Sequence, residues 1–276
     1  MDSKKTFLND KELDKLAQFL QRTTGVELES SKLRRFQRKI EDVFKTHNID
    51  DFNTFYHRIR YQNDTELIQD LTNAVTVNET YFWREFEQFH ALTKKVLPQF
   101  IQANELPTIR ILVAPCSSGE ELYSIMLAIL DAGSLLEKLN IELVGIDIDS
   151  KMVFKAKTGL YSQRSVEKLP EHLKKTYFTK VGKLYKIDDA LRQNAHFLQA
   201  NIFDETIVQK LGHFDILFSR NMLIYFNEAD KQKCYTIFHT ILNEQGVLFL
   251  GHADANGINK KLFAPLERGF HIYKKI

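Results

Sequence analysis

The stretch from Ile109 to Gly119 constrains the fold more than any other part of this sequence. A short apolar run, Ile109 to Val113, gives way to the small and polar residues Ala114 to Gly119, and an amphipathic segment begins directly afterwards. This order predicts a β-strand, a tight turn and the start of a helix. Small side chains in such a turn let a ligand approach the backbone, and the free amides of a helix N-terminus favour a negative group.

An acidic residue stands where a second strand should end. The apolar run Ile141 to Ile146 is followed at once by Asp147. In a βαβ unit, an acid at this place can accept hydrogen bonds from both hydroxyl groups of a ribose, which predicts an adenosine-type cofactor. The turn lacks Gly-x-Gly-x-x-Gly and Gly-Lys-Ser/Thr, so it is neither a nicotinamide or flavin fingerprint nor a P-loop. An ordinary α/β connection without a ligand remains the alternative.

Composition narrows the class of protein. The chain has 276 residues with 43% apolar content, enough for a sizeable core in one large domain or a domain with a smaller companion. Its two cysteines, Cys116 and Cys234, form no disulfide framework or zinc-ligand pattern and are interpreted as free thiols, and no metal site is expected. A net charge of +2 gives no case for general nucleic-acid binding.

No segment of the sequence predicts membrane insertion. No apolar run approaches the ~18 to 20 residues that span a bilayer. The first residues, Met1 to Lys5, are followed by more polar residues and lack the apolar section of a signal peptide. We therefore expect a cytoplasmic protein.

The first 75 residues predict a small bundle of consecutive helices. Helix-start signals occur at Asn9 or Asp10, at Ser30 or Ser31, near Asp51 and near Asp64, each followed by apolar residues at helical spacing. The four expected apolar faces are Leu13, Leu16, Ala17 and Leu20; Leu33, Phe36, Ile40 and Val43; Phe52, Phe55, Tyr56 and Ile59; and Leu67, Ile68, Leu71 and Val75.

From about Asn78 onward, helical and strand patterns alternate, as expected of a mostly parallel sheet with helices on both faces. The expected strands are 109–113, 141–146, 214–218 and 246–250, with a shorter one near 195–198. Residues 160–190 interrupt the alternation of helices and strands. Within them, residues 177–187 are predicted to form a hairpin with its turn near Gly182. We predict a helical domain over 1–75 and, over 76–276, a Rossmann-like α/β domain carrying a small antiparallel β insertion at about 160–190.

Four further patterns occur in one order along the chain. They are Val77-Asn78-Glu79-Thr80-Tyr81-Phe82-Trp83-Arg84-Glu85, then Cys116-Ser117-Ser118-Gly119-Glu120-Glu121, then Gly145-Ile146-Asp147-Ile148-Asp149, then Ser219-Arg220-Asn221-Met222-Leu223-Ile224-Tyr225-Phe226. With Gly251-His252 near the end, this order closely resembles the CheR-type chemotaxis methyltransferases, which methylate receptor glutamates with S-adenosylmethionine. The resemblance is strong over about 76–276 and covers the helical part only in architecture.

The resemblance implies a role for each matching residue. Asn78, Thr80 and Arg84 match the segment that closes over the cofactor, with Arg84 near the methionine part or the reacting carboxylate. Cys116 and Gly119 belong to the cofactor turn, Glu121 would bind the ammonium group, Asp147 would hold the ribose, and Asn201 and Ile202 would lie beside the adenine. Arg220 and Asn221 end a strand where α/β sheets place ligands, and Tyr225 would face the sulfonium. Arg84 and Tyr225 are the expected catalytic positioning residues.

Several of these residues have plainer interpretations. Arg84 could be a solvated helix charge, and Tyr225 could be a buried aromatic with a satisfied hydroxyl. Glu120 is interpreted as a first-turn acid that favours the helix dipole, and Cys116 as a small turn residue. The sequence also departs from the family pattern at three places. Leu122 replaces a common proline and Trp83 replaces a phenylalanine. Gly251-His252-Ala253-Asp254 occurs where Gly-His-Ser-Glu is usual.

The implied function is formation of glutamyl methyl esters on chemoreceptors during sensory adaptation. A glutamate side chain, with a pKa of ~4.3, is already ionised at neutral pH, so the missing Ser-His-Asp set or metal cluster is no objection. Two alternatives stay open. One is a methyltransferase of another protein or a small molecule, and the other is a non-catalytic module that binds the cofactor or its product, S-adenosylhomocysteine.

A basic segment in the helical part is the candidate receptor contact. Lys32, Arg34, Arg35, Arg38 and Lys39 place five basic groups in eight residues of the second helix. A charge run is usually just a solvated face, but the resembling family uses a basic helix here to meet the acidic helical bundle of the receptor. The turn at Gly182 is short, so no docking on a C-terminal receptor pentapeptide is expected, and we expect a monomer.

Overall fold

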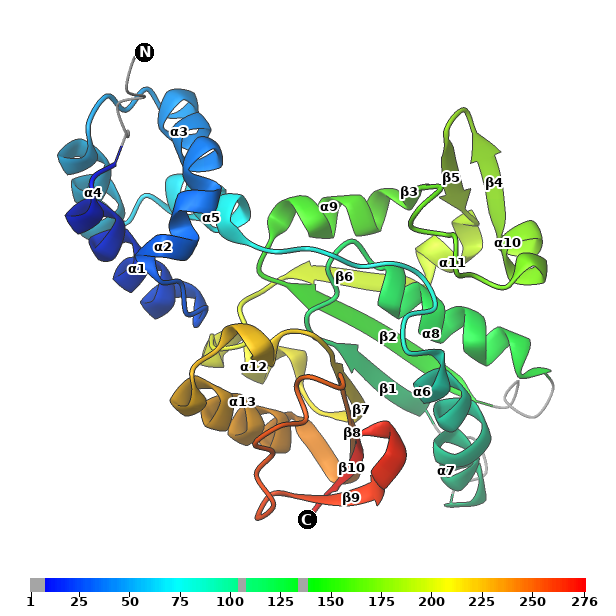
Figure 1. Ribbon diagram of the computed structural model, residues 1–276. Coiled ribbons are helices and arrows are strands. Elements are labelled where there is room, and N and C mark those ends of the chain that lie inside the picture. Colours follow the sequence, from blue (N-terminus) through cyan, green and yellow to red (C-terminus); the bar gives the residue numbers. More distant parts are fainter. Residues whose placement is uncertain (1–7, 104–107, 134–138) are drawn as a thin grey trace.

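The N-terminal helices form a bundle of their own, joined to the rest of the molecule by one extended segment (Figure 1). The computed structural model describes residues 8–103, 108–133 and 139–276. The bundle consists of α1 (Asp10–Thr24), α2 (Ser30–Leu33), α3 (Gln37–Thr46), α4 (Phe52–Tyr61) and α5 (Thr65–Val75). Its core contains the expected apolar faces, although Phe36, Tyr56 and Ile68 are only partly buried, and it also includes Leu8, Phe44, Ile49 and Ala74.

Side-chain caps fix the starts of three of these helices. Asn9 accepts a hydrogen bond from the backbone N–H of Glu12, whose carboxylate in turn accepts from the backbone N–H of Asn9. Asp51 and Asp64 cap α4 and α5 in the same way, through backbone amides in the first turn. Each cap is worth about 1 kcal/mol of helix stability. The predicted starts of these helices are therefore confirmed.

The second predicted helix differs from the expectation. It is divided into α2 and α3 by a 3₁₀ turn over Arg34–Phe36, where Phe36 has φ −97° and ψ 0°. A 3₁₀ turn has three residues per turn instead of 3.6. The regular spacing expected between residues 34 and 38 is therefore interrupted, although Arg34, Arg35, Arg38 and Lys39 are all exposed.

A seven-stranded sheet forms the centre of the second part, with strand order β6-β2-β1-β7-β8-β10-β9. Its strands are β1 (Thr108–Val113), β2 (Asn140–Asp147), β6 (Ala195–Gln199), β7 (Phe214–Ser219), β8 (Leu242–Leu250), β9 (Phe263–Glu267) and β10 (Ile272–Lys275). The first five are the predicted strands and pair in parallel. The two C-terminal strands were not predicted, and β10 pairs antiparallel with both of its neighbours.

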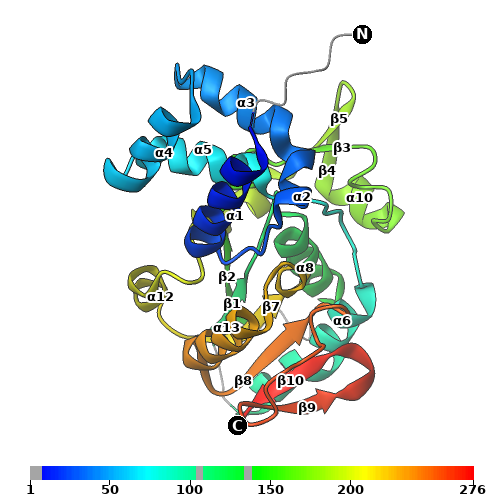
Figure 2. The ribbon, with the colours of Figure 1, turned by 60° about the vertical axis from the view of Figure 1, so that its left-hand side comes forward.

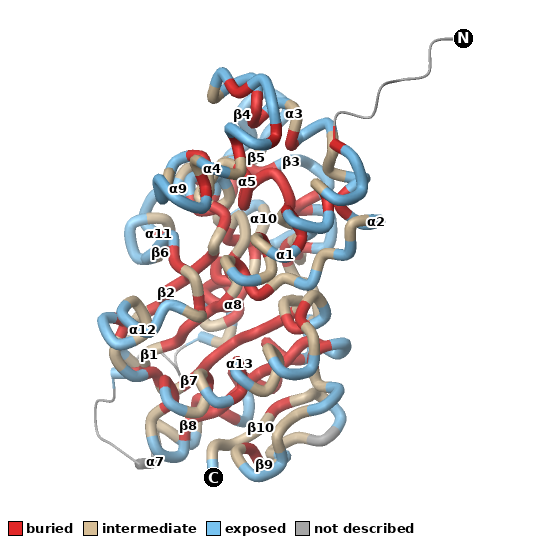
Figure 3. The backbone as a smooth tube through the Cα atoms, turned by 90° about the vertical axis from the view of Figure 1, so that its left-hand side faces the viewer, coloured by how far each residue is buried: buried red, intermediate tan, exposed pale blue. Residues whose placement is uncertain are grey.

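Helices cover both faces of this sheet (Figures 1 and 2). They are α6 (Phe86–Ala91), α7 (Leu97–Ala103), α8 (Glu120–Asp131), α9 (Ser150–Thr158), α12 (Glu205–Leu211) and α13 (Glu228–Ile241), with a π-helical turn over Leu92–Val96 between α6 and α7. Successive strand side chains point to opposite faces. Accordingly, Ile111 belongs to the apolar cluster with α8, whereas Leu112 belongs to the cluster with α13. Figure 3 shows these strands as the buried centre of the fold.

The predicted antiparallel insertion is present and contains one more strand than expected. Its sheet has the order β3-β5-β4, formed by β3 (Leu160–Ser162), β4 (Phe178–Val181) and β5 (Leu184–Ile187), with α10 (Glu171–Tyr177) and α11 (Asp189–Gln193) beside it. The hairpin turn contains Gly182 at φ +62°. Phe178 and Tyr161 of this sheet pack edge-on against Phe82, which ties the insertion to the segment after the helical bundle.

The strand order identifies where a ligand can bind. The chain proceeds from β1 to β2 and β6 on one side and returns to β7 on the other side of β1. In open α/β sheets, ligands bind outside the carboxyl ends of the strands where this reversal occurs. The residues that follow β1, β2 and β7 therefore surround the candidate site.

Candidate functional site

One cavity lies at the carboxyl ends of β1, β2 and β7. Its walls come from the turns after these strands, from the segment between α5 and α6, and from the loop between α1 and α2. The predicted residues that line it are Asn78, Thr80, Arg84, Cys116, Glu121, Asp147, Asn201, Ile202, Arg220, Asn221 and Tyr225. These residues are far apart in the sequence, and the fold brings them to one place.

Gly119 is the exception among the predicted site residues. It is not among the residues that line the cavity, and its N–H donates to the carbonyl oxygen of Cys116. Its φ is +92°, and a Cβ atom there would lie 2.9 Å from the Cβ of Ala156 and 3.1 Å from the rings of Tyr123 and Phe197. Close packing and a left-handed backbone both require a glycine here, and its contact with the cofactor stays a prediction.

Asp147 is a buried carboxylate with room for further acceptor bonds. Its Oδ1 accepts from the backbone N–H of Asp149 at 2.8 Å, and its Oδ2 accepts from the N–H of Ser117 at 2.7 Å. Burial raises the pKa of Asp147 to about 6, against the lowering effect of these amides. Each carboxylate oxygen has a second lone pair, so the group can accept from a ligand diol.

Glu121 and Arg220 form an ion pair inside the cavity wall. Oε2 of Glu121 lies 3.0 Å from Nε of Arg220, and both side chains are largely buried. Burial raises the pKa of Glu121, and the charge of Arg220 opposes this. Oε1 of Glu121 has no hydrogen-bond partner among the residues that the structure describes. A buried, unpaired carboxylate oxygen on a cavity wall suits a cationic ligand group.

Arg220 also holds the segment that carries Arg84. Its Nη1 donates to the carbonyl oxygen of Arg84 at 2.8 Å and lies 3.9 Å from the carboxylate of Glu85. Its guanidinium lies over the ring of Phe89, 5.1 Å from the centroid. One buried side chain therefore connects the end of β7, the first turn of α8 and the start of α6.

The guanidinium of Arg84 is available for a ligand. It donates to the carbonyl oxygen of Glu79 at 3.1 Å and lies 5.6 Å from the ring of Tyr81. No ion pair joins it to a carboxylate in the described part of the chain. Its positive charge lowers the pKa of Tyr225, while burial raises that pKa more strongly. Both side chains line the cavity, so a carboxylate arriving there would meet a cation and a protonated hydroxyl.

A second buried carboxylate shapes the loop that carries Tyr225. Asp254 accepts hydrogen bonds from the backbone amides of Asn221 and Ile224, and burial raises its pKa to about 6. Asn221 has φ +60°, a left-handed conformation that costs energy for a residue other than glycine. A Cβ at Gly251 would lie 2.6 Å from Oδ2 of Asp254, so that glycine permits the close approach. Sequence reasoning noted Asp254 only as a departure from the family pattern.

The helical bundle supplies part of the cavity wall, which sequence reasoning missed. Thr24, Val26 and Leu28 line the cavity from the loop between α1 and α2. Hydrogen bonds hold this loop in place, because the side chain of Asn201 donates to the carbonyl oxygen of Thr23 and the N–H of Glu27 donates to that of Tyr225. No local pattern marks these residues, since only tertiary packing brings them to the site.

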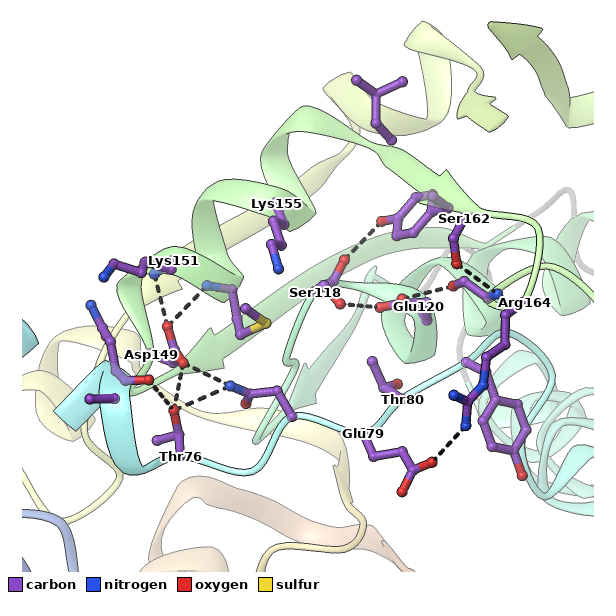
Figure 4. Close-up of a pocket in the computed structure, with 18 of the residues that line it drawn as sticks. Thr76, Glu79, Thr80, Ser118, Glu120, Asp149, Lys151, Lys155, Ser162 and Arg164 are labelled. Carbon is purple, nitrogen blue, oxygen red and sulfur yellow. Dashed lines mark hydrogen bonds and ion pairs between the residues drawn. The ribbon is translucent and has the colours of Figure 1, made fainter. Parts of the chain in front are cut away.

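Asn78 both lines the cavity and anchors the segment between the two parts. Its amide nitrogen donates to Oδ2 of Asp149 at 2.7 Å, and the hydroxyl of Thr76 donates to the same oxygen at 2.6 Å. The other oxygen of Asp149 caps α9 through the N–H groups of Lys151 and Met152. Figure 4 shows Thr76 and Asp149 facing each other across this junction.

The donor set fits a nucleoside that also carries an ammonium group. Asp147 can accept from ribose hydroxyls and the free oxygen of Glu121 can accept from the ammonium, while Ile148, Ile202 and Phe226 offer apolar wall. Within the described ranges, no cluster of three or more His, Cys, Asp or Glu residues is suited to a metal ion. In the same part of the chain, no helix is both long and apolar enough to span a bilayer.

Comparison with known families agrees with this geometry. Residues 78–269 match the profile described as CheR methyltransferase, SAM binding domain, and residues 11–76 match that described as CheR methyltransferase, all-alpha domain. SAM is S-adenosylmethionine, which has a ribose and an ammonium group.

Curated relatives match over most of the chain. Chemotaxis protein methyltransferase 2 of Vibrio cholerae is 36% identical over 90% of this chain and 86% of its own length. The chemotaxis protein methyltransferase of Campylobacter jejuni is 34% identical over 99% of both chains. A probable biofilm formation methyltransferase WspC of Pseudomonas putida is 28% identical over 90% of this chain, which spans 58% of that longer protein.

The predicted contact of Asp147 with the ribose has a consequence for pH. With a pKa of about 6, the carboxylate of Asp147 is charged at pH 7.5 and becomes protonated as the pH falls below 6. Because hydroxyl donors prefer the charged acceptor, S-adenosylmethionine affinity should be highest above pH 7 and decline below pH 6. Asp147→Asn should weaken binding at pH 7.5 by about 10- to 100-fold, since a hydrogen bond to a charged group is worth ~1.5–3 kcal/mol. Calorimetric titration measures both effects.

Asp188→Asn is the matched control for this titration, because Asp188 is an exposed cap of α11 outside the cavity. It should bind the cofactor like the unmodified protein. Unchanged affinity in Asp147→Asn would contradict the ribose assignment.

The loop after β7 gives a second prediction. Asp254→Asn places an amide NH₂ group against backbone N–H donors, so the Asn221 to Tyr225 loop should shift. Leaving a buried donor unpaired costs ~1–3 kcal/mol, and we expect turnover to fall by about 10-fold or more while cofactor affinity changes less. Asp204→Asn, which alters the cap of α12, is the control. Equal turnover of the two variants would show that Asp254 does not position the loop.

Proposed function

Because this chain belongs to the CheR family of S-adenosylmethionine-dependent methyltransferases, we propose that it transfers methyl groups to glutamate side chains of chemoreceptors, forming glutamyl methyl esters. The family and the cofactor follow from matches that cover both parts of the chain. The receptor substrate and the role in adaptation are our proposal. We also propose that the protein acts in the cytoplasm, where the receptor signalling domains lie.

The relatives favour chemoreceptors over other protein substrates. Two proteins named as chemotaxis methyltransferases match at 34–36% identity and are covered by this chain over 86–99% of their length. The WspC relative is less similar, at 28% identity, and the match spans 58% of its length. A methyltransferase of another protein therefore remains the second candidate, with the same cofactor cavity and a different partner surface.

The observation that carries the proposal is the guanidinium of Arg84 on the cavity wall, which forms no ion pair with a carboxylate of the described residues. A planar guanidinium matches a carboxylate in a two-bond geometry, which a glutamate side chain would provide. Tyr225 lines the same cavity, and its pKa, raised by burial, keeps the hydroxyl protonated at neutral pH. These two groups can orient a carboxylate without removing a proton from it. A module that only binds the cofactor has no need of them.

The chemistry needs positioning more than proton transfer. The cofactor supplies a methyl group made electrophilic by its bond to a sulfonium. A glutamate side chain is ionised at neutral pH, so its oxygen can attack without a general base. Arg84 and Tyr225 would hold that carboxylate, and the covering segment 76–80 would exclude water, which strengthens each electrostatic contact. The burial-raised pKa of the Cys116 thiol keeps it protonated and unreactive.

We further propose that the basic segment Lys32–Lys39 contacts the receptor and that no pentapeptide docks on the insertion. Arg35 and Arg38 have no carboxylate partner among the described residues, whereas Arg34 pairs with Asp10 and Lys32 pairs with Glu29. The hairpin of the insertion turns at Gly182 and Lys183, directly between β4 and β5. This short turn supports the absence of a tether. The monomeric state is likewise a proposal.

The reaction itself is the first test. Incubation with labelled S-adenosylmethionine and receptor membranes from the same cell should incorporate label that mild alkali releases, as expected of methyl esters. Arg84→Ala should lower this rate by about 100-fold, since misplacing a substrate by 1 Å can cost that much. Tyr225→Phe should lower it by about 10-fold, equivalent to one lost hydrogen bond of ~1.4 kcal/mol.

Arg84→Lys keeps the charge but loses the fork of donors, and it should recover only part of the rate. Alkali-stable label would point to another acceptor. Full turnover in both Arg84→Ala and Tyr225→Phe would remove these residues from the mechanism.

The basic segment gives a separate prediction. Reversing Arg34, Arg35 and Arg38 to Glu should slow receptor methylation by at least 10-fold at low receptor concentration, because like charges would then face the acidic receptor. Cofactor affinity should not change, since none of the three residues lines the cavity. Initial rates at several receptor concentrations, with a parallel calorimetric titration, measure both. Unaltered methylation by the triple variant would count against this contact.

A further inference from the structure

A large groove lies beside the cofactor cavity, on the other side of the segment that joins α5 to α6. Its volume is about 1060 Å³. It is lined by α3 and α5 of the helical bundle, by α9, by the loop after β3 and by the joining segment. The groove and the cofactor cavity share Thr76, Asn78, Glu79 and Thr80, so this segment is a wall between them. Figure 4 shows the groove between α9 and the joining segment.

The buried acids at the base of the groove are already satisfied. Glu120 accepts hydrogen bonds from the hydroxyls of Ser118 at 2.7 Å and Ser165 at 2.9 Å. Asp149 is occupied by Thr76 and Asn78 and by the cap of α9. These carboxylates hold the walls together and are not exposed to a partner. The charge that a partner meets is therefore set by the outer residues.

Cations without a carboxylate partner predominate at the surface of the groove. Lys151 pairs with Asp70, and Arg164 pairs with Glu79. Lys39, Lys155 and Lys168 also line the groove and have no carboxylate partner among the described residues. Of the exposed acids that line the groove, Asp42 pairs with Lys45. Glu167 has no ion pair with any described residue. In Figure 4, Lys155 extends from α9 into the groove. The groove is lined by six carboxylates and five cations, but its outer charges without an ion pair among the described residues are three lysines and one glutamate, which favours an acidic partner.

These cations include one residue of the basic segment and one residue close to Arg84. Lys39 is the last residue of the basic segment Lys32–Lys39. At the other end, the ammonium of Lys168 lies 4.6 Å from the centre of the Tyr81 ring, and the guanidinium of Arg84 lies 5.6 Å from the centre of the same ring. Arg84 lines the cofactor cavity. The groove therefore adjoins the basic segment through Lys39, and the ring of Tyr81 brings it close to Arg84, which lies on the cavity side of the joining segment.

We propose that this groove binds an acidic helical segment of the substrate protein next to the glutamate that is methylated, with Lys39, Lys155 and Lys168 as its charge contacts. The inference rests on the proposed function, because that function supplies an acidic helical substrate. A helix about 10 Å wide and about 13 Å long, or about two turns, occupies roughly 1000 Å³, which is of the same order as the groove's volume of about 1060 Å³. The contacts with the groove would place a neighbouring glutamate at Arg84.

The test reverses the charges of Lys155 and Lys168. Neither residue lines the cofactor cavity or belongs to the basic segment. In Lys155→Glu/Lys168→Glu, the KM for the receptor should rise by about 10-fold, while kcat at saturating receptor and the Kd for S-adenosylmethionine stay within twofold. Exposed ion pairs are screened by salt. The ratio of the variant's KM to that of the unmodified protein should therefore be smaller at 300 mM NaCl than at 50 mM NaCl. Fluorescence anisotropy with the labelled cytoplasmic domain of the cell's own chemoreceptor measures binding without turnover.

Lys157→Glu is the matched control, because Lys157 is exposed on the same helix and does not line the groove. It should leave the KM unchanged. An equal rise in KM for Lys157→Glu would indicate a general charge effect and overturn the proposal, as would an unchanged KM for the double variant. If the unmodified protein fails to methylate receptors but still binds the labelled domain through Lys155 and Lys168, the proposed function fails and the groove assignment stands.

Discussion

A single buried arginine holds the functional site together. The side chain of Arg220 is 1% exposed, and it joins the carboxylate of Glu121 to the backbone of Arg84. Burying a charge is costly unless it is paired and hydrogen-bonded, and removing one partner of such a pair typically costs ~3–5 kcal/mol. The pair therefore fixes the relative positions of α8, α6 and β7. It also leaves one oxygen of Glu121 free, so the same contact that stabilises the site prepares it for a cationic ligand group.

The cofactor cavity belongs to both parts of the chain. The loop after α1 lies against the loop after β6, and a Cβ at Gly25 would clash with the ring of Phe203. The N–H of Glu27 donates to the carbonyl oxygen of Tyr225, so the helical bundle also contacts the loop that carries a proposed catalytic side chain. On the opposite side of the cavity, Asp149 binds the segment that leaves α5. The bundle is thus a structural wall of the site as well as a candidate docking surface.

Sequence patterns predicted the parts of the fold that depend on local spacing. The five parallel strands and the helix starts at Asn9, Asp51 and Asp64 follow from apolar periodicity and capping residues, and the structure confirms them. Strands β9 and β10 were not predicted, because their partly exposed, antiparallel pairing at the sheet edge gives a weak apolar pattern. The division of α2 from α3 was also missed, since an exposed basic run has no signal for a 3₁₀ turn.

In the candidate site too, sequence patterns predicted the residues whose place depends on the local pattern and missed those that depend on tertiary packing. Asp147 was predictable because the end of a parallel strand is a defined place in this topology, and the residue lines the cavity as expected. A glycine in a turn has two explanations, close ligand approach and close packing, and the sequence could not reveal the packing of Gly119 against Ala156 and Phe197. Val26 and Leu28 could not be found, since their contact with the site depends on how the helical bundle packs.

The charged groups assigned to the cofactor are largely buried, whereas the lysines proposed to contact a protein partner are exposed. The net charge of the chain is only +2, yet its charged groups are of two kinds. Glu121, Asp147 and Arg220 are buried, so dissolved ions screen them weakly, and burial raises the pKa values of both carboxylates. Lys155 and Lys168 are exposed and strongly screened. Ionic strength should therefore weaken the proposed contacts of the exposed lysines with a protein substrate more than the contacts of the buried carboxylates with the cofactor.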